Sequence, residues 1–440
     1  MKILNKFLLV FLFAFVLVSC EDFVGGDINQ DPNNPTSVPL TAQMPAFQIA
    51  LADMYGGSFS RFNCMLVQQV EGVARQWASF NQYTGLTPNR FDDAWTDTYE
   101  NILNEIQIAK ASALEQGLNH YLGVLYVMEA YTLMIATDVW DDMPYTDALK
   151  GVDALNPVFD TQASIYSTVY SLLDQAIGLF NGPSGTVVPG SEDVFYGGNI
   201  DLWERAAHAI IARGKMNDKD YNKALEEAKA SFTDPSQNMG FQYPDANAAA
   251  QWYRFNRDRT GDLEFHPFMR NLMTALNDTA RLAIMDNTFI TDHPYMVPDY
   301  FQELITYREM QFVIAEVDVR NNSGGTQEGY DAYLNGIKAG FEELGVSEAD
   351  YEAYIAQPEV GVGVGNLDLE TVMTQKYLAM FLQPEVYSDW RRTGIPALTP
   401  VSGTQIPVRW HYSANEYLFN SNSPSEADVD IFNDRVGWNR

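Results

Sequence analysis

Apolar residues recur every third or fourth position along much of the chain between residues 40 and 232. The clearest run consists of Trp95, Tyr99, Ile102, Ile106 and Ala109. This spacing places all five side chains on one face of an α-helix. Two further runs, from Ile165 to Leu179 and from Tyr221 to Phe232, repeat the same period. The first half of the chain is therefore predicted to be helical.

The same pattern continues in the second half. It predicts a pair of helices over Phe301–Val319 and Tyr330–Leu344, followed by a helix over Thr371–Leu382. Helices that come in pairs separated by short loops are typical of tetratricopeptide-like repeats. The predicted fold class is mostly α, with a tetratricopeptide-like helical-repeat scaffold.

Long stretches rich in Gly, Pro, Asn and aromatic residues lie between these helices. They cover residues 182–200, 233–300, 355–368 and 393–440. Loops longer than about 15 residues are uncommon in compact domains unless they serve a function. We therefore expect a loop-rich subdomain inserted on the helical scaffold, with residues 40–440 forming a single domain.

The N-terminus has the pattern of an export signal. Lys2 and Lys6 precede twelve apolar residues from Phe7 to Val18, and Leu17-Val18-Ser19-Cys20 follows the pattern of a bacterial lipobox. The run is shorter than the ~20 residues that span a membrane. We expect a signal peptide over residues 1–19, lipidation of Cys20, and a lipid anchor and tether over residues 20–39. The alternative is an ordinary signal peptide with a chance cysteine.

Composition narrows the class of ligand. The chain of 440 residues has a formal net charge of −31, and aromatic residues make up 13% of it. Such a surface repels nucleic acid phosphates and anionic lipids, so the sequence favours neutral or cationic ligands. Cys64, between Phe62 and Leu66, is expected to be a buried apolar residue and not a nucleophile.

Motifs for catalysis and metal binding are incomplete. The sequence contains no GxSxG, HExxH or P-loop pattern, and the five histidines are scattered without metal-ligand spacing. The segment Gly361–Gly365 resembles a dinucleotide loop, but Asn366 stands where its last glycine belongs. The sequence thus predicts no catalytic residue, no metal and no cofactor.

Several segments of the first half match sequence motifs. Trp95-Thr-Asp-Thr-Tyr99-Glu-Asn-Ile102 has the WxxxYxxI pattern and is similar to an early helix of one known family, the SusD/RagB-type nutrient-binding lipoproteins. The stretch from Thr137-Asp138 through Pro144-Tyr145 and Ala148-Leu149 is similar to its tDxxGdxPYxdAl motif, although Trp140-Asp141-Asp142 departs from the usual glycine-bearing turn. Asn156-Pro157 through Ile165-Tyr166, and Tyr196-Gly197-Gly198-Asn199 with Trp203, resemble two further motifs, the last with Asn199 in place of the usual aspartate.

The second half continues the resemblance in the same order. Tyr307-Arg-Glu309 through Ala315-Glu316 is similar to the family's YaExxFllAEA helix. Thr374-Gln375-Lys376-Tyr377 and Trp390-Arg391-Arg392-Thr393-Gly394-Ile-Pro396 resemble its tQKY and WRRTGxP segments. Ile406-Pro407-Val408-Arg409 and Tyr412 follow, with Ser413 where a proline is usual.

This resemblance implies a function. Members are anchored on the extracellular face of the outer membrane, where they bind oligosaccharides or peptides. They act as the lid of a SusC-type TonB-dependent transporter. The resemblance therefore implies a binding protein, not an enzyme, whose partners are a nutrient ligand and that transporter.

Two aromatic clusters in predicted loops are candidates for ligand binding, because sugar rings stack on aromatic faces. The first consists of Trp77, Phe80 and Tyr83, with Asn81, Gln82 and Asn89 as polar neighbours. The second consists of Trp252, Tyr253, Phe255 and Arg257, with Arg254 and Asn256 nearby. The alternative is that these rings pack within the protein.

Other aromatic and basic residues are expected to be structural. We assign Trp95, Tyr99, Trp140 and Trp203 to the core. Arg391 and Arg392 are expected to form ion pairs within the protein.

Two other classes of function remain open at this point. A lipid-anchored glycoside hydrolase requires two carboxylates facing each other across a sugar, and the sequence does not define such a pair. A purely structural repeat protein would bind no small ligand.

Overall fold

The computed structural model describes residues 38–287, 289 and 293–440, and the chain is mostly helical over these residues, as predicted. The predicted signal peptide, Cys20 and almost all of the tether lie outside the described residues. The first helix described, α3 (Leu40–Met54), begins after Pro39.

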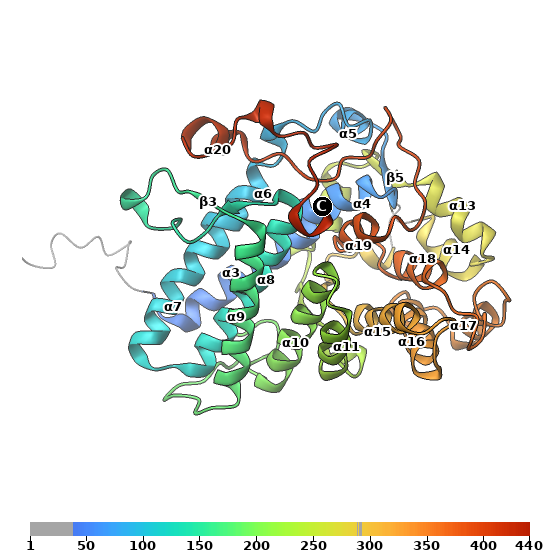
Figure 1. Ribbon diagram of the computed structural model, residues 1–440, viewed down its shortest axis with the longest axis horizontal. Helices are drawn as coiled ribbons and strands as arrows, with labels where there is room; N and C mark the ends of the chain where they lie inside the picture. Colours follow the sequence, from blue (N-terminus) through green and yellow to red (C-terminus); the bar gives the residue numbers. More distant parts are fainter. Residues whose placement is uncertain (1–37, 288, 290–292) are drawn as a thin grey trace, which may run out of the picture.

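The helical scaffold consists of antiparallel pairs arranged side by side. The helices are α7 (Glu105–Gln116), α8 (Asn119–Trp140), α9 (Gln162–Phe180), α10 (Ile200–Asn217), α11 (Tyr221–Ala230), α15 (Tyr307–Asn321), α16 (Gln327–Glu343), α17 (Glu348–Ile355), α18 (Leu369–Ala379) and α19 (Val386–Thr393). Figure 1 shows α7, the pair α8 and α9, the pair α10 and α11, the pair α15 and α16, and α17 in a row from left to right, with α18 and α19 above this row. The repeat-like scaffold predicted from the sequence is confirmed.

A second set consists of shorter helices that cover this scaffold. All but one of them precede it in the chain. The set comprises η2 (Tyr55–Phe59), α4 (Ser60–Leu66), α5 (Arg75–Asn81), η3 (Pro88–Arg90), α6 (Asp92–Thr96), η4 (Asp97–Asn104) and, near the C-terminus, α20 (Ala414–Phe419). In Figure 1, α5 and α20 lie with the C-terminal loops along the top of the molecule, opposite α10, α11 and α16.

The segment 233–300, predicted as loop, is more structured than expected. It contains the strands β4 (Met239–Gln242) and β5 (Leu263–Phe265) and the helices α12 (Gln251–Asp258), α13 (Pro267–Ala275) and α14 (Thr279–Met285). The prediction that this whole segment is loop is therefore wrong. These helices are only seven to nine residues long, too short for a sustained apolar period to reveal them.

The predicted helix Phe301–Val319 begins later than expected. Its first residues form strand β6 (Phe301–Ile305), which pairs antiparallel with β4. Helix α15 starts only after Thr306, whose hydroxyl accepts a hydrogen bond from Glu309 N at 3.2 Å. An N-cap threonine thus fixes the boundary between strand and helix.

Two more antiparallel pairs complete the β-structure of the described residues. Strand β1 (Val70–Gly72) pairs with β5, and β2 (Met143–Pro144) pairs with β3 (Phe159–Asp160). Each joins segments that are distant in sequence, and the first ties the N-terminal helices to the 233–300 segment.

Aromatic side chains fill the centre of the core. Trp140 and Trp203 are fully buried and Trp95 nearly so, as predicted, while the half-buried Tyr99 donates its hydroxyl to Pro144 O at 2.6 Å. Trp410 joins them from the C-terminal segment, stacked on Phe91 at 4.8 Å between ring centroids. Helix α8 is long and apolar enough to cross a membrane, but 94% of its apolar window is buried inside the protein, so it is the core helix.

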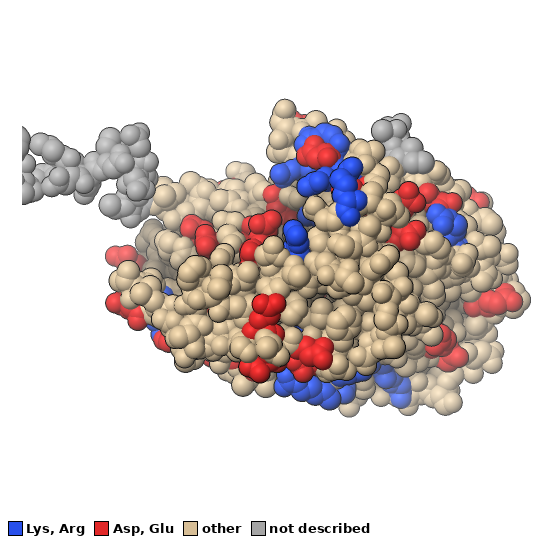
Figure 2. Space-filling view, turned by 90° about the horizontal axis from the view of Figure 1, so that it is seen from above, with Lys and Arg blue, Asp and Glu red and all other residues tan. Residues whose placement is uncertain are grey.

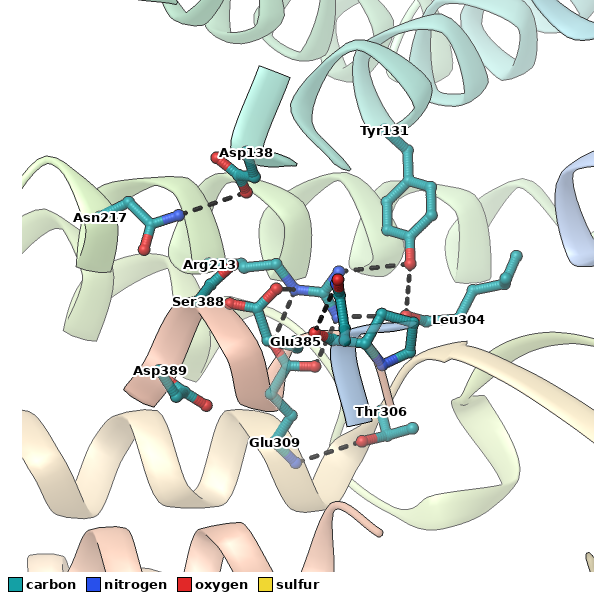
Figure 3. A network of polar contacts seen from close by, with 12 residues as sticks. Tyr131, Asp138, Arg213, Asn217, Leu304, Thr306, Glu309, Glu385, Ser388 and Asp389 are labelled. Carbon is teal, nitrogen blue, oxygen red and sulfur yellow. Dashed lines mark hydrogen bonds and ion pairs between the residues drawn. The ribbon is translucent and has the colours of Figure 1, made fainter. Parts of the chain in front are cut away.

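A buried charge network joins the two halves of the scaffold (Figure 3). Arg213 of α10 forms a bidentate pair with Glu309 of α15, at 2.7 and 2.6 Å. Its guanidinium also donates to Leu304 O and to the hydroxyl of Tyr131. Glu385 lies 3.6 Å away, and burial raises the pKa of its carboxyl well above its usual range. The network therefore fixes α8, α10, β6, α15 and the start of α19 relative to one another.

The two consecutive arginines near the C-terminal end of α19 have different roles. Arg392 pairs with Glu316 and, at 2.8 Å, with Asp389, so its predicted ion pairing is confirmed. Arg391 instead donates to Asp138 O at 2.7 Å and Val408 O at 3.1 Å. The prediction that Arg391 forms an ion pair is therefore wrong. Backbone carbonyls can also satisfy a guanidinium, because it has five hydrogen-bond donors.

Candidate functional site

A polar cavity of about 390 Å³ opens where α12 packs against the first helical segments of the chain. Its lining residues come from α3, η2, α4, α6, η4 and α12. They are Ala50, Asp53, Gly57, Ser58, Arg61, Asp93, Thr96, Asp97, Asn101, Gln251 and Arg254.

An irregular helical turn forms the floor of this cavity. Between α3 and α4 the chain forms the π-helical turn η2, in which Gly57 has non-helical dihedral angles. A Cβ atom at Gly57 would lie 3.5 Å from both Arg61 Nη2 and Gln251 Oε1. Glycine therefore leaves open space between these two polar side chains. Such turns interrupt helices most often at functional sites.

Arg61 is the most unusual side chain of the cavity. Its guanidinium lies over the ring of Phe255, 5.1 Å from the ring centroid. Within the described part of the chain it has neither a hydrogen bond nor an ion pair. Desolvation by burial lowers its pKa to about 10, and Arg254 adds to this effect. The side chain is half-buried and lines the open cavity, so its donors are available to a ligand that can accept hydrogen bonds.

Asp53 and its neighbours provide the acceptors on the opposite wall. Asp53 accepts a hydrogen bond from the Tyr243 hydroxyl, and its other oxygen lies 3.8 Å from Arg254 Nη1. Burial and the negative charge of Asp53 raise the pKa of Tyr243 well above its usual range, so the phenol remains a donor. Asp53 is thereby held in one orientation toward the cavity.

A second carboxylate belongs to the helical segment that faces α3. Asp97 accepts a hydrogen bond from Asn101 Nδ2 at 2.8 Å. Burial raises the pKa of the Asp97 carboxyl, and the nearby Asp93 contributes to the rise.

The cavity therefore offers nearly balanced charge and many hydrogen-bonding groups. Three aspartates face two arginines, and Ser58, Thr96, Asn101 and Gln251 add uncharged donors and acceptors. This arrangement suits a hydroxyl-rich, uncharged ligand better than a strongly charged one, since hydroxyls both donate and accept.

Of the second predicted aromatic cluster, only Phe255 is shown to contact a side chain that lines this cavity. Phe255 contacts Arg61, and Tyr253 and Arg257 lie near the surface of α12 with the guanidinium 5.9 Å from the ring centroid. Trp252, in contrast, is 2% exposed, and its Nε1 donates to Ser60 Oγ at 2.9 Å. Trp252 thus holds α12 against α4 and presents no face to a ligand in this structure.

The first predicted cluster divides in two. Trp77 and Phe80 are buried and pack on Phe62, and Trp77 also meets Phe255 at 5.2 Å between centroids. Packing thus joins the two clusters through Phe255. Tyr83 lies apart from them and borders a different cavity.

Sequence reasoning missed Asp53, Arg61 and Gln251. The available signal was the pair Gly56-Gly57 within an otherwise helical pattern, because adjacent glycines inside a helix are costly and mark a close approach or an irregular turn.

Cys64 is buried, as predicted. Its thiol lies 3.9 Å from Ser60 Oγ and 3.7 Å from Gln383 O, and burial raises the pKa of the thiol well above its usual range. It is not an activated nucleophile. Among residues 38–287, 289 and 293–440, no group of three or more His, Cys, Asp or Glu side chains is arranged to hold a metal ion.

Comparison with protein families gives one match. Residues 32–295 and 291–413 match the SusD-like family model described as "starch-binding associating with outer membrane". No curated protein matches the chain.

Solved structures show the same fold. A SusD/RagB family protein from Bacteroides thetaiotaomicron has 20% identity and a TM-score of 0.73, covering 92% of this chain and 99% of its own. A chitin-binding protein has 21% identity and a TM-score of 0.74, covering 91% and 100%. A SusD homologue from Bacteroides fragilis has 18% identity and a TM-score of 0.73, covering 92% and 100%.

Proposed function

Because this chain belongs to the SusD-like family of outer-membrane-associated nutrient-binding proteins, we propose that it binds an oligosaccharide and delivers it to a SusC-type TonB-dependent transporter. The observation that carries the binding proposal is the cavity lined by both Arg61, which has no ion pair among the described residues, and Asp53. The ligand hydroxyls would accept from Arg61 and donate to Asp53 and Asp97.

Aromatic contact would add to these hydrogen bonds. Phe255 contacts Arg61 of the cavity, and Tyr253 is a second partly exposed ring of α12. Carbohydrate C–H groups pack on such ring faces. In this proposal Arg257, which lies over Tyr253, borders the same face.

The N-terminal pattern supports export and lipid anchoring, and the family resemblance supports the extracellular side. In this proposal Cys20 carries the lipid anchor, and residues 20–39 tether the domain to the extracellular side of the outer membrane. Twenty residues at ~3.3 Å each extend to at most about 66 Å. A tether of this reach would let the domain move over a transporter like a lid without leaving the membrane.

Titration calorimetry on residues 21–440 tests the binding proposal. Maltoheptaose, chitohexaose and short peptides serve as ligands for the wild-type protein and for Arg61→Ala. We expect one class of oligosaccharide to bind, with an affinity at least tenfold lower in Arg61→Ala. The matched control is Arg270→Ala, which removes a half-exposed arginine that pairs with Asp286 at 2.7 Å outside the cavity.

The results also separate the alternatives. Equal affinity in Arg61→Ala and the wild type would reject this cavity as the site. Release of shorter sugars from a bound oligosaccharide would instead support a glycoside hydrolase, and peptide binding alone would change the ligand class.

The transporter partnership has its own test. Native extraction of outer membranes, followed by capture of this protein, should recover a large β-barrel transporter in constant proportion. Repeated recovery of the protein alone would contradict the lid proposal.

A further inference from the structure

A second cavity, of about 490 Å³, lies among the loops that carry Tyr83 and the C-terminal segments. It is lined by Gln82, Tyr83, Thr84, Ser402, Gly403, Thr404, Gln405, Asp430, Phe432 and Asn433. None of these residues lines the Arg61 cavity, so the two sites are separate.

Two aromatic rings form one wall. Tyr83 and Phe432 meet edge to face, with centroids 6.2 Å apart and planes at 68°. Tyr83 has a φ of 64°, in the left-handed region that non-glycine residues rarely occupy. Its hydroxyl accepts a hydrogen bond from Val401 N at 3.1 Å. Residues held in such a conformation cluster at binding sites, where the surrounding structure offsets the cost.

The loop that carries Phe432 is fixed by its own hydrogen bonds. Asp430 accepts from Phe432 N at 2.9 Å and from Asn433 Nδ2 at 2.7 Å, and Asp430 N donates to Asp434 Oδ2 at 2.7 Å. The ring of Phe432 is therefore positioned before any ligand arrives. Such preorganisation reduces the entropy lost on binding.

The remaining lining is polar and almost uncharged. Gln82, Ser402, Thr404 and Gln405 make no side-chain hydrogen bond to any residue that the structure describes, and Asp430 is the single charged residue in the lining. Amides and hydroxyls beside the half-buried ring of Phe432 and the edge of the largely buried Tyr83 match the hydroxyls and apolar faces of a sugar. The lining contains no cation that would select a phosphate or a carboxylate.

We propose that this cavity is a second saccharide subsite, which binds an uncharged oligosaccharide between the Tyr83–Phe432 wall and the amides of Gln82 and Gln405. The proposal rests on the proposed function, because it assumes that the ligand of this protein is a saccharide. It assigns two independent contacts with the glycan to one chain.

Calorimetric titration with the oligosaccharide series tests the subsite, using Phe432→Ala and Gln405→Ala. Both substitutions alter surface loops, and Phe419→Ala, which removes a phenylalanine that is 75% exposed on α20, is the matched control. We expect the wild type to bind two equivalents of a short oligosaccharide. One equivalent should weaken at least fivefold in Phe432→Ala and in Gln405→Ala, and remain unchanged in Phe419→Ala.

The Arg61→Ala variant distinguishes this proposal from the proposed function. A single equivalent that is lost in Arg61→Ala and unchanged in Phe432→Ala would overturn the second subsite and leave the proposed function intact. An equivalent that is lost in Phe432→Ala and unchanged in Arg61→Ala would support this subsite and reject the Arg61 cavity. Absence of saccharide binding to the wild type would overturn both.

Discussion

Arg61 differs from the other buried arginines in how its charge is satisfied. Arg213, Arg308 and Arg392 each form an ion pair with a glutamate, whereas the half-buried Arg61 lies over the face of Phe255 and forms no ion pair among the described residues. A partly desolvated cation without a paired carboxylate lowers stability. The cost is understandable if a ligand supplies the missing acceptors, as the proposed function requires.

Trp252 and Tyr253 are neighbours with opposite roles. Trp252→Ala removes a fully buried ring and should lower the free energy of unfolding by about 3–5 kcal/mol. Tyr253→Ala removes a partly exposed ring and should lower it by less than about 1 kcal/mol while weakening oligosaccharide binding. Urea denaturation and calorimetric titration of both variants check this pair. Equal destabilisation by the two substitutions would contradict the assignment.

His266 links folding to pH. It caps α13 by accepting a hydrogen bond from Phe268 N at 3.0 Å, and burial lowers its pKa from 6.5 to about 4. The unfolded chain therefore binds a proton more readily, and stability falls as pH decreases from about 6.5 to about 4. One such group costs about 2 kcal/mol at pH 5.

His266→Asn tests this linkage, since asparagine keeps a capping acceptor but does not titrate. The difference in Tm between pH 7.5 and pH 5 should be smaller in the variant than in the wild type. An unchanged difference would mean that His266 is not the group responsible.

Sequence reasoning performed unevenly at the level of residues. Burial of Cys64 follows from its apolar neighbours, and the core tryptophans follow from helical periodicity. Arg61 was missed because its significance is the absence of a partner, which only the folded structure reveals. Trp77 and Trp252 are predicted as ligand contacts because they are aromatic residues in predicted loops. In the structure Trp77 packs on Phe62, Trp252 donates a hydrogen bond to Ser60, and both side chains are buried.

At the level of elements, the irregular turn η2 positions the cavity, and its two glycines are not equivalent. A Cβ at Gly56 would lie 2.0 Å from Gln302 Oε1, whereas one at Gly57 would make ordinary contacts at 3.5 Å. Gly56→Ala should cost about 1–3 kcal/mol of stability through overpacking. Gly57→Ala should be milder for stability, but its methyl group enters the cavity and should weaken oligosaccharide binding about three- to tenfold. Thermal denaturation and titration of the two variants measure both effects, and a tighter-binding Gly57→Ala would contradict this placement of the ligand.

Long helices could be predicted from the sequence and short elements could not. The helices α9 and α16 were found because each repeats its apolar period over several turns. The sequence pattern predicts helix over β6 because this strand runs directly into α15, and only the N-cap residue Thr306 separates the two elements. The sequence pattern predicts loop over residues 233–300 because the strands of this segment pair with strands distant in sequence. Local periodicity does not reveal such pairing.

Over the whole molecule, charge is distributed unevenly at the surface. Figure 2 shows acidic side chains scattered over the face seen from above, and basic side chains in one larger group near the top of the view with smaller groups on the right and along the lower edge. The net charge of −31 disfavours close approach to anionic lipid head groups. A lid in this position would therefore be held by its tether and its partner, not by adhesion to the membrane.

One exposed region is apolar instead of charged. The apolar patch consists of Val152, Leu155, Val158, Leu418 and Phe419, each at least half exposed. Its two segments are joined by hydrogen bonds from Asn420 Nδ2 to Pro157 O at 2.9 Å and from Ser421 N to Asn156 Oδ1 at 2.8 Å. Exposed apolar side chains gathered on two adjoining segments favour a protein contact, and the acidic charge of the chain favours a protein over an anionic lipid surface as the partner.

We expect this patch to contact the proposed transporter. The double variant Leu418→Ser/Phe419→Ser should reduce co-extraction of the transporter several-fold with little change in Tm, because both side chains are already exposed to solvent. The matched control is Val187→Ser/Val188→Ser, which alters two half-exposed valines in the loop before α10. Equal loss of the transporter in both double variants would show that the patch is not a specific contact.

The burial of Cys64 has a practical consequence for following such a lid. The chain has two cysteines, and the unlipidated protein that begins at residue 21 retains only Cys64, whose thiol is buried and held largely protonated. A maleimide dye would therefore leave the native protein nearly unlabelled under folding conditions. A single added cysteine, for example Leu418→Cys, would become the one reactive thiol. Fluorescence from a dye at that position could then report in real time whether the domain opens and closes over its partner.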